Sequence, residues 1–148
     1  MKKVITIIAI IVLISIIVNA IGRSNDPNWK FLRDLSPSVR RKFILFLEEI
    51  KRLGYTPVIR ESVRSSKQQN EYHRQDPRNP PAGGSSHEVG LAIDMDIYKN
   101  GVVYSKKTPK VLWLKTGVPQ LANEYGIRWG GNFKGYADNN HFDNLKVA

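Results

Sequence analysis

An alternating apolar pattern near the middle of the chain constrains the fold more than any other feature. In residues 91–98 apolar side chains at the odd positions alternate with Ala92, Asp94, Asp96 and Tyr98, which is the period-2 pattern of a strand with one apolar face. Asn100-Gly101 follows, and an Asn-Gly pair before a second strand pattern predicts a two-residue hairpin turn. We therefore expect a sheet that is at least partly antiparallel.

The flanking segments predict helices and further strands. Residues 36–54 carry the clearest helix signal: Ser36-Pro37 is a helix start, apolar residues recur at helical spacing, and Gly54 is a stop. Other helices are expected after Ser65 or Ser66 and at 108 and 118, strands at 55–59, 127–129 and near 138–143, and a loop at 76–86. The expected fold class is α+β, a small single domain with a mainly antiparallel sheet flanked by helices.

The amino terminus predicts export. Lys2 and Lys3 precede an almost wholly apolar run at 4–18, and about 15 apolar residues lie between the lengths of a signal-peptide core and a membrane span. The sequence after the run resembles a cleavage site, while residues 4–21 read together form a short anchor. We divide the chain into a signal peptide or membrane anchor (1–24), a linker (25–35) and a folded domain (36–148), which we expect in the periplasm, the cell wall or the medium.

Charge and cysteine content limit the partners and the metal ligands. The formal net charge of +10 attracts polyanions, whether nucleic acid, anionic lipid or anionic cell-wall polymers, and charge alone does not choose among them. The basic residues are scattered and no nucleic-acid-reading motif is present, so we expect no nucleic acid partner. Because the chain has no cysteine, any metal must be held by histidine and carboxylates.

Three residues provide a ligand set for one zinc ion. His87 lies at a loop-to-strand boundary, Asp94 lies in the predicted strand, and His141 lies near a later strand. A catalytic zinc needs about three nitrogen or oxygen ligands and an open position for water. Each residue alone could be an ordinary surface or core side chain, but a partly buried Asp94 needs a metal or a cation beside it. A His-Glu-x-x-His helix is excluded because position 91 is leucine.

The same residues carry a family resemblance. Ser85, His87, Gly90, Ala92 and Asp94 complete the pattern Ser-x-His-x-x-Gly-x-Ala-x-Asp, which resembles the D-Ala-D-Ala metallopeptidases and L-Ala-D-Glu peptidases. Residues 126–133 and Asp138-x-x-His141-Phe142 resemble motifs of the endolysin-like branch, and Arg64-Ser65 with Gln69 resembles a further motif of the family. The resemblance covers about residues 36–143 and implies the zinc fold shared with lysostaphin-type enzymes and hedgehog.

The resemblance implies a zinc peptidase that acts on peptidoglycan stem peptides. It implies one zinc ion per chain, held by His87, Asp94 and His141, with Asp138 as general base and acid and Arg64 as oxyanion donor or carboxylate clamp. Ser85, Gln69 and Trp129 are candidate substrate contacts, and Asp96 and Asp143 are candidates to orient a ligand histidine. We expect a monomer.

One motif residue bears on the bond that is cleaved. Aspartate at position 138, where D-Ala-D-Ala enzymes usually have glutamate, favours the L-Ala-D-Glu bond. A D-Ala-D-Ala carboxypeptidase or dipeptidase and a non-catalytic zinc-stabilised wall-binding module remain the alternatives.

Overall fold

The computed structural model describes residues 25–145, and the fold is formed by the unit that begins at residue 31. The predicted signal peptide or anchor at 1–24 lies outside the described residues. Among residues 25–145 no helix has the length and apolar character needed to cross a membrane.

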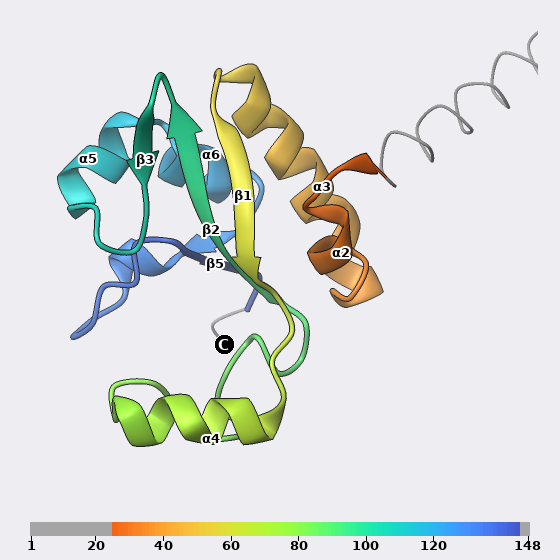
Figure 1. Cartoon of the computed structure of the whole chain (residues 1–148), viewed down its shortest axis with the longest axis vertical. Helices are drawn as coiled ribbons and strands as arrows, with labels where there is room; N and C mark the ends of the chain where they lie inside the picture. The colour runs from red at the N-terminus through yellow and green to blue at the C-terminus, as the bar shows by residue number, and fades with distance from the viewer. Residues whose placement is uncertain (1–24, 146–148) are drawn as a thin grey trace, which may run out of the picture. The chain divides into compact units, whose positions relative to one another are not determined.

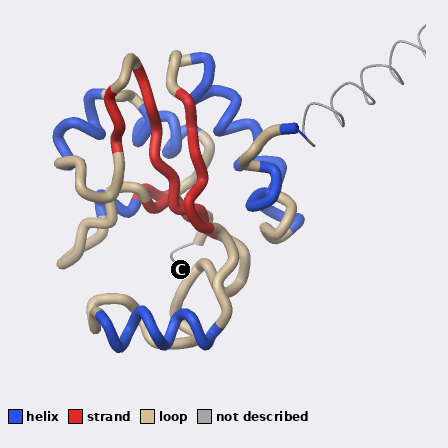
Figure 2. Tube along the Cα trace, viewed as in Figure 1, coloured by secondary structure: helices blue, strands red, loops and turns tan. Residues whose placement is uncertain are grey.

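The chain forms a small α+β domain, as the sequence predicts (Figures 1 and 2). The helices and strands, in chain order, are α2 (Trp29–Leu32), α3 (Pro37–Arg52), β1 (Thr56–Glu61), α4 (Ser66–Gln75), β2 (Ala92–Lys99), β3 (Val102–Tyr104), α5 (Lys110–Lys115), α6 (Val118–Glu124), β4 (Arg128–Trp129), the 3-10 turn η1 (Gly130–Asn132) and β5 (His141–Asp143).

Local signals account for most element boundaries. The Ser65 side chain and Gln68 form a reciprocal capping box at the start of α4. Asn100 and Gly101 have φ values of 51° and 77°, which the tight turn between β2 and β3 requires. Ser36 precedes Pro37 as expected, but its hydroxyl contacts Ser38 at 2.9 Å and makes no capping bond.

The central strand β2 pairs with three neighbours and thereby organises the sheet. The strand order is β1-β2-β5-β4, and β3 pairs with β2 as well. Two strands pair with the same edge of β2. Its first residues pair with β5 and its last residues pair with β3, and both pairs are antiparallel. Asp94 lies directly opposite His141 in the β2–β5 pair. Two predicted metal ligands are therefore cross-strand neighbours.

A bulge in β1 adds Glu61 to the same row. Ile59 pairs with Met95, yet Glu61 pairs with Asp94, so Arg60 is an extra residue in β1. Because side chains alternate between the two faces of a strand, the extra residue turns Glu61 to the face that carries Asp94. Glu61, Asp94 and His141 thus lie side by side on neighbouring strands.

The opposite face of the sheet forms the core with the helices. Ile93 and Phe142 are cross-strand neighbours and are fully buried. The Phe142 ring lies 5.5 Å from Phe46 of α3 and 5.9 Å from Trp113 of α5, measured between ring centroids. Because this face is sealed by apolar contacts, it fixes the strands that carry the polar row on the other face.

The segment before α3 differs from the predicted linker. Leu32 and Leu35 are buried, and the Ser36 amide donates to the Gly90 carbonyl at 2.9 Å. Gly90 has a φ of 65°, and a Cβ at this position would lie 2.9 Å from the Ser36 nitrogen. Residues 31–35 therefore belong to the domain, because their apolar side chains are buried and Gly90 admits their backbone at close range.

Candidate metal centre

His87, Asp94 and His141 bring one potential metal-binding atom each to a single point. Nε2 of His87 lies 3.2 Å from Nδ1 of His141 and 3.2 Å from Oδ1 of Asp94. Nδ1 of His141 lies 2.9 Å from the same carboxylate oxygen. The three residues form a group that could hold a metal ion.

The other nitrogen of each histidine is fixed by a hydrogen bond. Nδ1 of His87 lies 2.6 Å from the Ser62 carbonyl oxygen, so it donates its proton there and Nε2 points to the other two donor atoms. Nε2 of His141 lies 3.0 Å from Oδ2 of Asp143, so Nδ1 is the nitrogen that can bind a metal once it has lost its proton. Such partners fix the tautomer and the ring orientation of metal-binding histidines.

Charges around the group favour an ionised carboxylate. Burial acts to raise the pKa of Asp94, but hydrogen bonds from His141 and His87 and their charges outweigh it and hold that pKa well below its usual range. Burial has the same effect on Asp143, whose pKa is nevertheless lowered to about 2, chiefly by the bonds from His141 and Arg128. Arg128 binds Asp143 with two donors, at 2.7 and 2.8 Å.

The donor atoms suit zinc in kind, number and spacing. A tetrahedral zinc site with bonds of about 2.0–2.1 Å separates its ligand atoms by about 3.3 Å, close to the 2.9–3.2 Å that separates these three atoms. Two imidazole nitrogens and one carboxylate oxygen are the ligand types of catalytic zinc, and three protein ligands leave a position for water. The residues therefore fit one zinc ion per chain.

Loss of the carboxylate behind His141 should weaken zinc binding without abolishing it. Asp143→Asn removes the charge that orients the imidazole, and loss of such a partner typically costs about 10–100-fold in metal affinity. Competition with a chromophoric chelator measures this change. Asp34→Asn, at an exposed carboxylate, is the control, and unchanged affinity in Asp143→Asn would contradict the orienting role.

Zinc binding should also release a proton at neutral pH. Burial lowers the pKa of His141, but bonds to Asp143 and Asp94 outweigh it and raise the pKa to about 9 in the metal-free chain. The ring is therefore protonated at pH 7, and zinc must displace that proton, so affinity should fall as the pH drops below about 9. Calorimetry at pH 7 in buffers with different protonation enthalpies should show about one proton released per zinc bound. Identical heats in all buffers would contradict this prediction.

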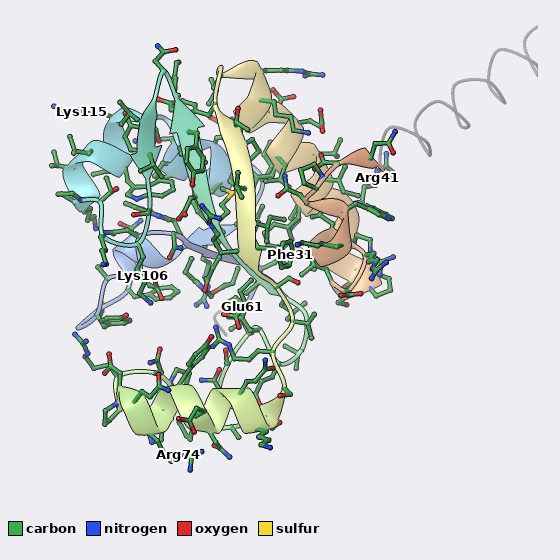
Figure 3. The ribbon with its side chains drawn as sticks, in the orientation of Figure 1. Phe31, Arg41, Glu61, Arg74, Lys106 and Lys115 are labelled. Carbon is green, nitrogen blue, oxygen red and sulfur yellow. The ribbon has the colours of Figure 1, made fainter. Side chains whose placement is uncertain are left out.

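The donor group lies in the wall of a cavity of about 370 Å³. The lining residues come from the sheet and from α4 and the loop at 76–86. Figure 1 shows α4 lying apart from the sheet, beyond the end of β1. Glu61 lies at the end of β1, between the sheet and α4 (Figure 3). Besides the donor group, the lining consists of Glu61, Arg64, Tyr72, Arg78, Asn79, Pro80, Gly84, Ser85, Ser86, Lys106, Arg128, Phe133, Tyr136, Asp138, Asp143 and Leu145.

Arg64 is held rigidly at the edge of the donor group. Its Nε donates to Glu61 at 3.0 Å, its Nη1 donates to Gln69 at 2.7 Å, and its guanidinium lies 4.4 Å from the Tyr72 ring centroid. Nη2 lies 3.9 Å from Oδ2 of Asp94. Burial works against its charge, but the Glu61 carboxylate outweighs burial and raises the pKa of Arg64. A fixed cation thus faces the cavity.

Asp138 presents one free carboxylate oxygen. Oδ2 accepts from the Lys106 ammonium at 3.1 Å, while Oδ1 is buried and has no hydrogen-bond partner. Burial lowers the pKa of Lys106, but Tyr136 and Asp138 outweigh it and raise that pKa, so the lysine remains charged. The Asp138 side chain belongs to the cavity lining, and a carboxylate there can take up a proton.

The structure places the remaining candidates differently. Ser85 lines the cavity, and its hydroxyl accepts from the His87 amide at 3.3 Å. Gln69 and Trp129 are 0% and 3% exposed and are not part of the lining. The expectation of a direct substrate contact is therefore not met for these two.

Gln69 and Trp129 have structural roles instead. Gln69 holds Arg64 through its amide oxygen and donates to the Pro80 carbonyl at 2.5 Å, so it positions the arginine and the loop. Trp129 lies on the core face, with its ring 6.4 Å from Trp113, because it alternates with Arg128 along β4. The expected role of Asp96 is also corrected: it binds Arg60 at 2.7 Å and does not contact a ligand histidine.

Sequence reasoning missed three residues around the site. Arg128 reaches the site face and secures Asp143, Lys106 pairs with Asp138, and Phe133 lies 5.5 Å from the His141 ring. Of these three residues, only Arg128 could have been predicted from the sequence. Side chains alternate along a strand, so Arg128 must lie on the face opposite to that of the core residue Trp129. Lys106 and Phe133 lie on loops, where no period predicts side-chain direction.

A family model matches the part of the chain that carries the donor group. Residues 78–144 match the family model described as D-alanyl-D-alanine carboxypeptidase, of the M15 peptidases. The match and the His-Asp-His group agree with the resemblance of the sequence motifs to the zinc D-Ala-D-Ala metallopeptidases and L-alanyl-D-glutamate peptidases.

The chain is also similar to individual peptidoglycan peptidases. The peptidoglycan L-alanyl-D-glutamate endopeptidase CwlK of Bacillus subtilis is 28% identical, with 74% of this chain and 73% of that protein covered. The L-Ala D-Glu endopeptidase ChiX of Serratia marcescens has a similar structure, with a TM-score of 0.60, 26% identity, and coverage of 80% of this chain and 86% of that one. The zinc-bound D,D-pentapeptidase VanY of a VanB-type vancomycin resistance cassette shares the fold, with a TM-score of 0.52, 13% identity and coverage of 74% and 71%.

Proposed function

We propose that this chain is an exported zinc peptidase that hydrolyses the L-Ala-D-Glu bond in the stem peptide of bacterial peptidoglycan. The observation that carries the proposal is the convergence of His87, Asp94 and His141 in a cavity that also presents Asp138 and Arg64. These five residues are the ones that the family motifs assign to a zinc peptidase.

Different residues of the cavity have different roles in the proposed reaction. His87, Asp94 and His141 would hold zinc, which when bound lowers the pKa of a water molecule and polarises the scissile carbonyl. Asp138, which lines the cavity, accepts the proton of the attacking water on its carboxylate. It then returns that proton to the leaving amine as the C–N bond breaks. Lys106 donates to Oδ2 and holds the carboxylate in place.

Arg64 has two uses that fit its position. Its permanent charge can stabilise the negative oxygen that develops on the attacked carbonyl, or bind a carboxylate of the stem peptide. Glu61, Gln69 and Tyr72 immobilise it from three sides. The guanidinium therefore needs little reorganisation when the substrate arrives.

The choice of bond rests on the relatives and on Asp138. The two relatives with 26–28% identity are L-Ala-D-Glu endopeptidases, and position 138 carries the aspartate of that branch. The family model and the more distant VanY support the alternative, a D-Ala-D-Ala carboxypeptidase. A binding module without catalysis is disfavoured because Asp138 and Arg64 are both present.

Defined muropeptides distinguish these functions. The full chain is incubated in detergent with a muropeptide that contains both bonds, with zinc and with chelator, and the fragments are weighed by mass spectrometry. The proposal expects a cut between L-Ala and D-Glu that chelator abolishes. Release of terminal D-Ala would instead identify a carboxypeptidase, and an intact muropeptide with one zinc bound would identify a binding module.

The net charge of +10 gives the enzyme a further affinity for anionic wall polymers. Binding to washed sacculi should weaken as salt rises, because exposed charges separated by more than about 8 Å are screened at 0.15 M salt. Sedimentation at low and high salt measures the effect. Equal binding at both salt concentrations would rule out electrostatic retention.

A further inference from the structure

The surface formed by α5 and the turn before it combines exposed apolar side chains with lysines. We call Lys107 and the exposed residues of α5 the apolar–basic face, which comprises Lys107, Lys110, Val111, Leu112, Leu114 and Lys115. The Trp113 indole donates to the Ser105 carbonyl at 2.9 Å, which fastens α5 to the end of β3. Lys115 marks the outer end of α5 at the edge of the molecule, away from α4 (Figure 3).

The apolar residues of this face have no partner in the domain core. In α5 only Trp113 is buried, whereas Val111, Leu112 and Leu114 are 58%, 41% and 38% exposed. Single exposed apolar residues are common, but three on one six-residue helix indicate an interaction surface.

The charge of this segment is wholly positive. Residues 97–123 contain five lysines and no aspartate or glutamate. In α3 and α4 some basic residues are paired, as Lys51 with Glu48 and Arg74 with Glu71. Within residues 25–145 neither Lys107 nor Lys115 has an ion pair, and Lys110 donates only to the neutral amide of Asn132. Within the described residues, no carboxylate therefore neutralises these lysines, and their charge is available to an anionic partner.

We propose that the apolar–basic face docks on the surface of an anionic lipid bilayer. Lysines bind anionic headgroups, while Val111, Leu112 and Leu114 enter the boundary between headgroups and acyl chains. A soluble polyanion such as a wall polymer would use the lysines but gain nothing from the apolar residues. The combination of both therefore favours a lipid surface, and this inference is independent of the peptidase reaction.

The absence of cysteine gives a direct test. The full chain carrying Val111→Cys is labelled with an environment-sensitive fluorophore and mixed with vesicles of phosphatidylcholine, alone or with one third phosphatidylglycerol. Leu45→Cys, at a 45% exposed apolar position on α3, is the matched control with the same amino-terminal segment. We expect a blue shift and quenching by spin-labelled lipid only for the label at 111, and only with the anionic vesicles.

The lysine contribution is measured in the same assay. A lysine near an anionic surface contributes a factor of about five to binding, so Lys107→Gln with Lys115→Gln should lower the docked-to-undocked ratio about 25-fold. Lys67→Gln with Lys134→Gln, at two exposed lysines outside the face, should leave the ratio unchanged. No shift at 111, an equal shift at 45, or the same shift with polyglutamate instead of vesicles would each overturn the proposal.

Discussion

Asp138→Asn should lower kcat/KM for a stem-peptide substrate by about 10²–10⁴-fold, the usual contribution of a general base. An amide oxygen can still accept from Lys106, so the loop should keep its place, but an amide cannot take the proton of water. Zinc binding should remain at one ion per chain, because the donor group is untouched. Steady-state kinetics and metal analysis of the same preparation measure the two effects separately.

The control for this variant is Asp34→Asn, which removes an exposed carboxylate outside the cavity. It changes the net charge by the same amount and should leave kcat/KM unchanged. If Asp138→Asn retained full activity, another group would be the base. If it lost zinc as well, Asp138 would be part of the metal site and its assignment as the base would be wrong.

The sequence predicts the strands and helices of this domain well, because each has a local signal. The alternation at 91–98, the Asn100-Gly101 turn and the Ser65 capping box all depend on residues close together in the chain, and β2, its hairpin and α4 follow from them. The ligand group was predicted for a different reason. The spacing of His87, Asp94 and His141 predicts a metal site only when it is combined with the family motif.

The sequence does not predict how strands are aligned with one another. The pairing of Asp94 with His141 and the bulge at Arg60 depend on contacts between segments far apart in the chain. The errors for Gln69, Trp129 and Asp96 share this origin. Each was assigned by its place in a motif or strand, whereas packing buries the first two and Arg60 occupies the third.

The second large effect is expected at the metal ligand Asp94. Asp94→Asn removes the only carboxylate of the donor group and should weaken zinc binding by more than the about 10–100-fold expected for the outer partner Asp143. Zinc at 100 times its dissociation constant stabilises the folded chain by about 2.7 kcal/mol. The unmodified chain should therefore unfold at a higher temperature with zinc, while Asp94→Asn should show almost no change.

Asp96→Asn provides the matched comparison for that experiment, because Asp96 lies on the same strand and face but binds Arg60 instead of the histidines. Its loss can lower stability, yet the increase caused by zinc should remain, since the donor atoms and their orienting bonds are intact. Thermal unfolding with and without zinc separates the two cases. Equal loss of the zinc effect in both variants would contradict a direct bond from Asp94. It would show that any negative charge on this face of the sheet favours zinc binding by long-range electrostatic attraction. Loss in Asp94→Asn alone would indicate that Asp94 binds the metal, because zinc then depends on one oxygen at the point where the two imidazoles meet.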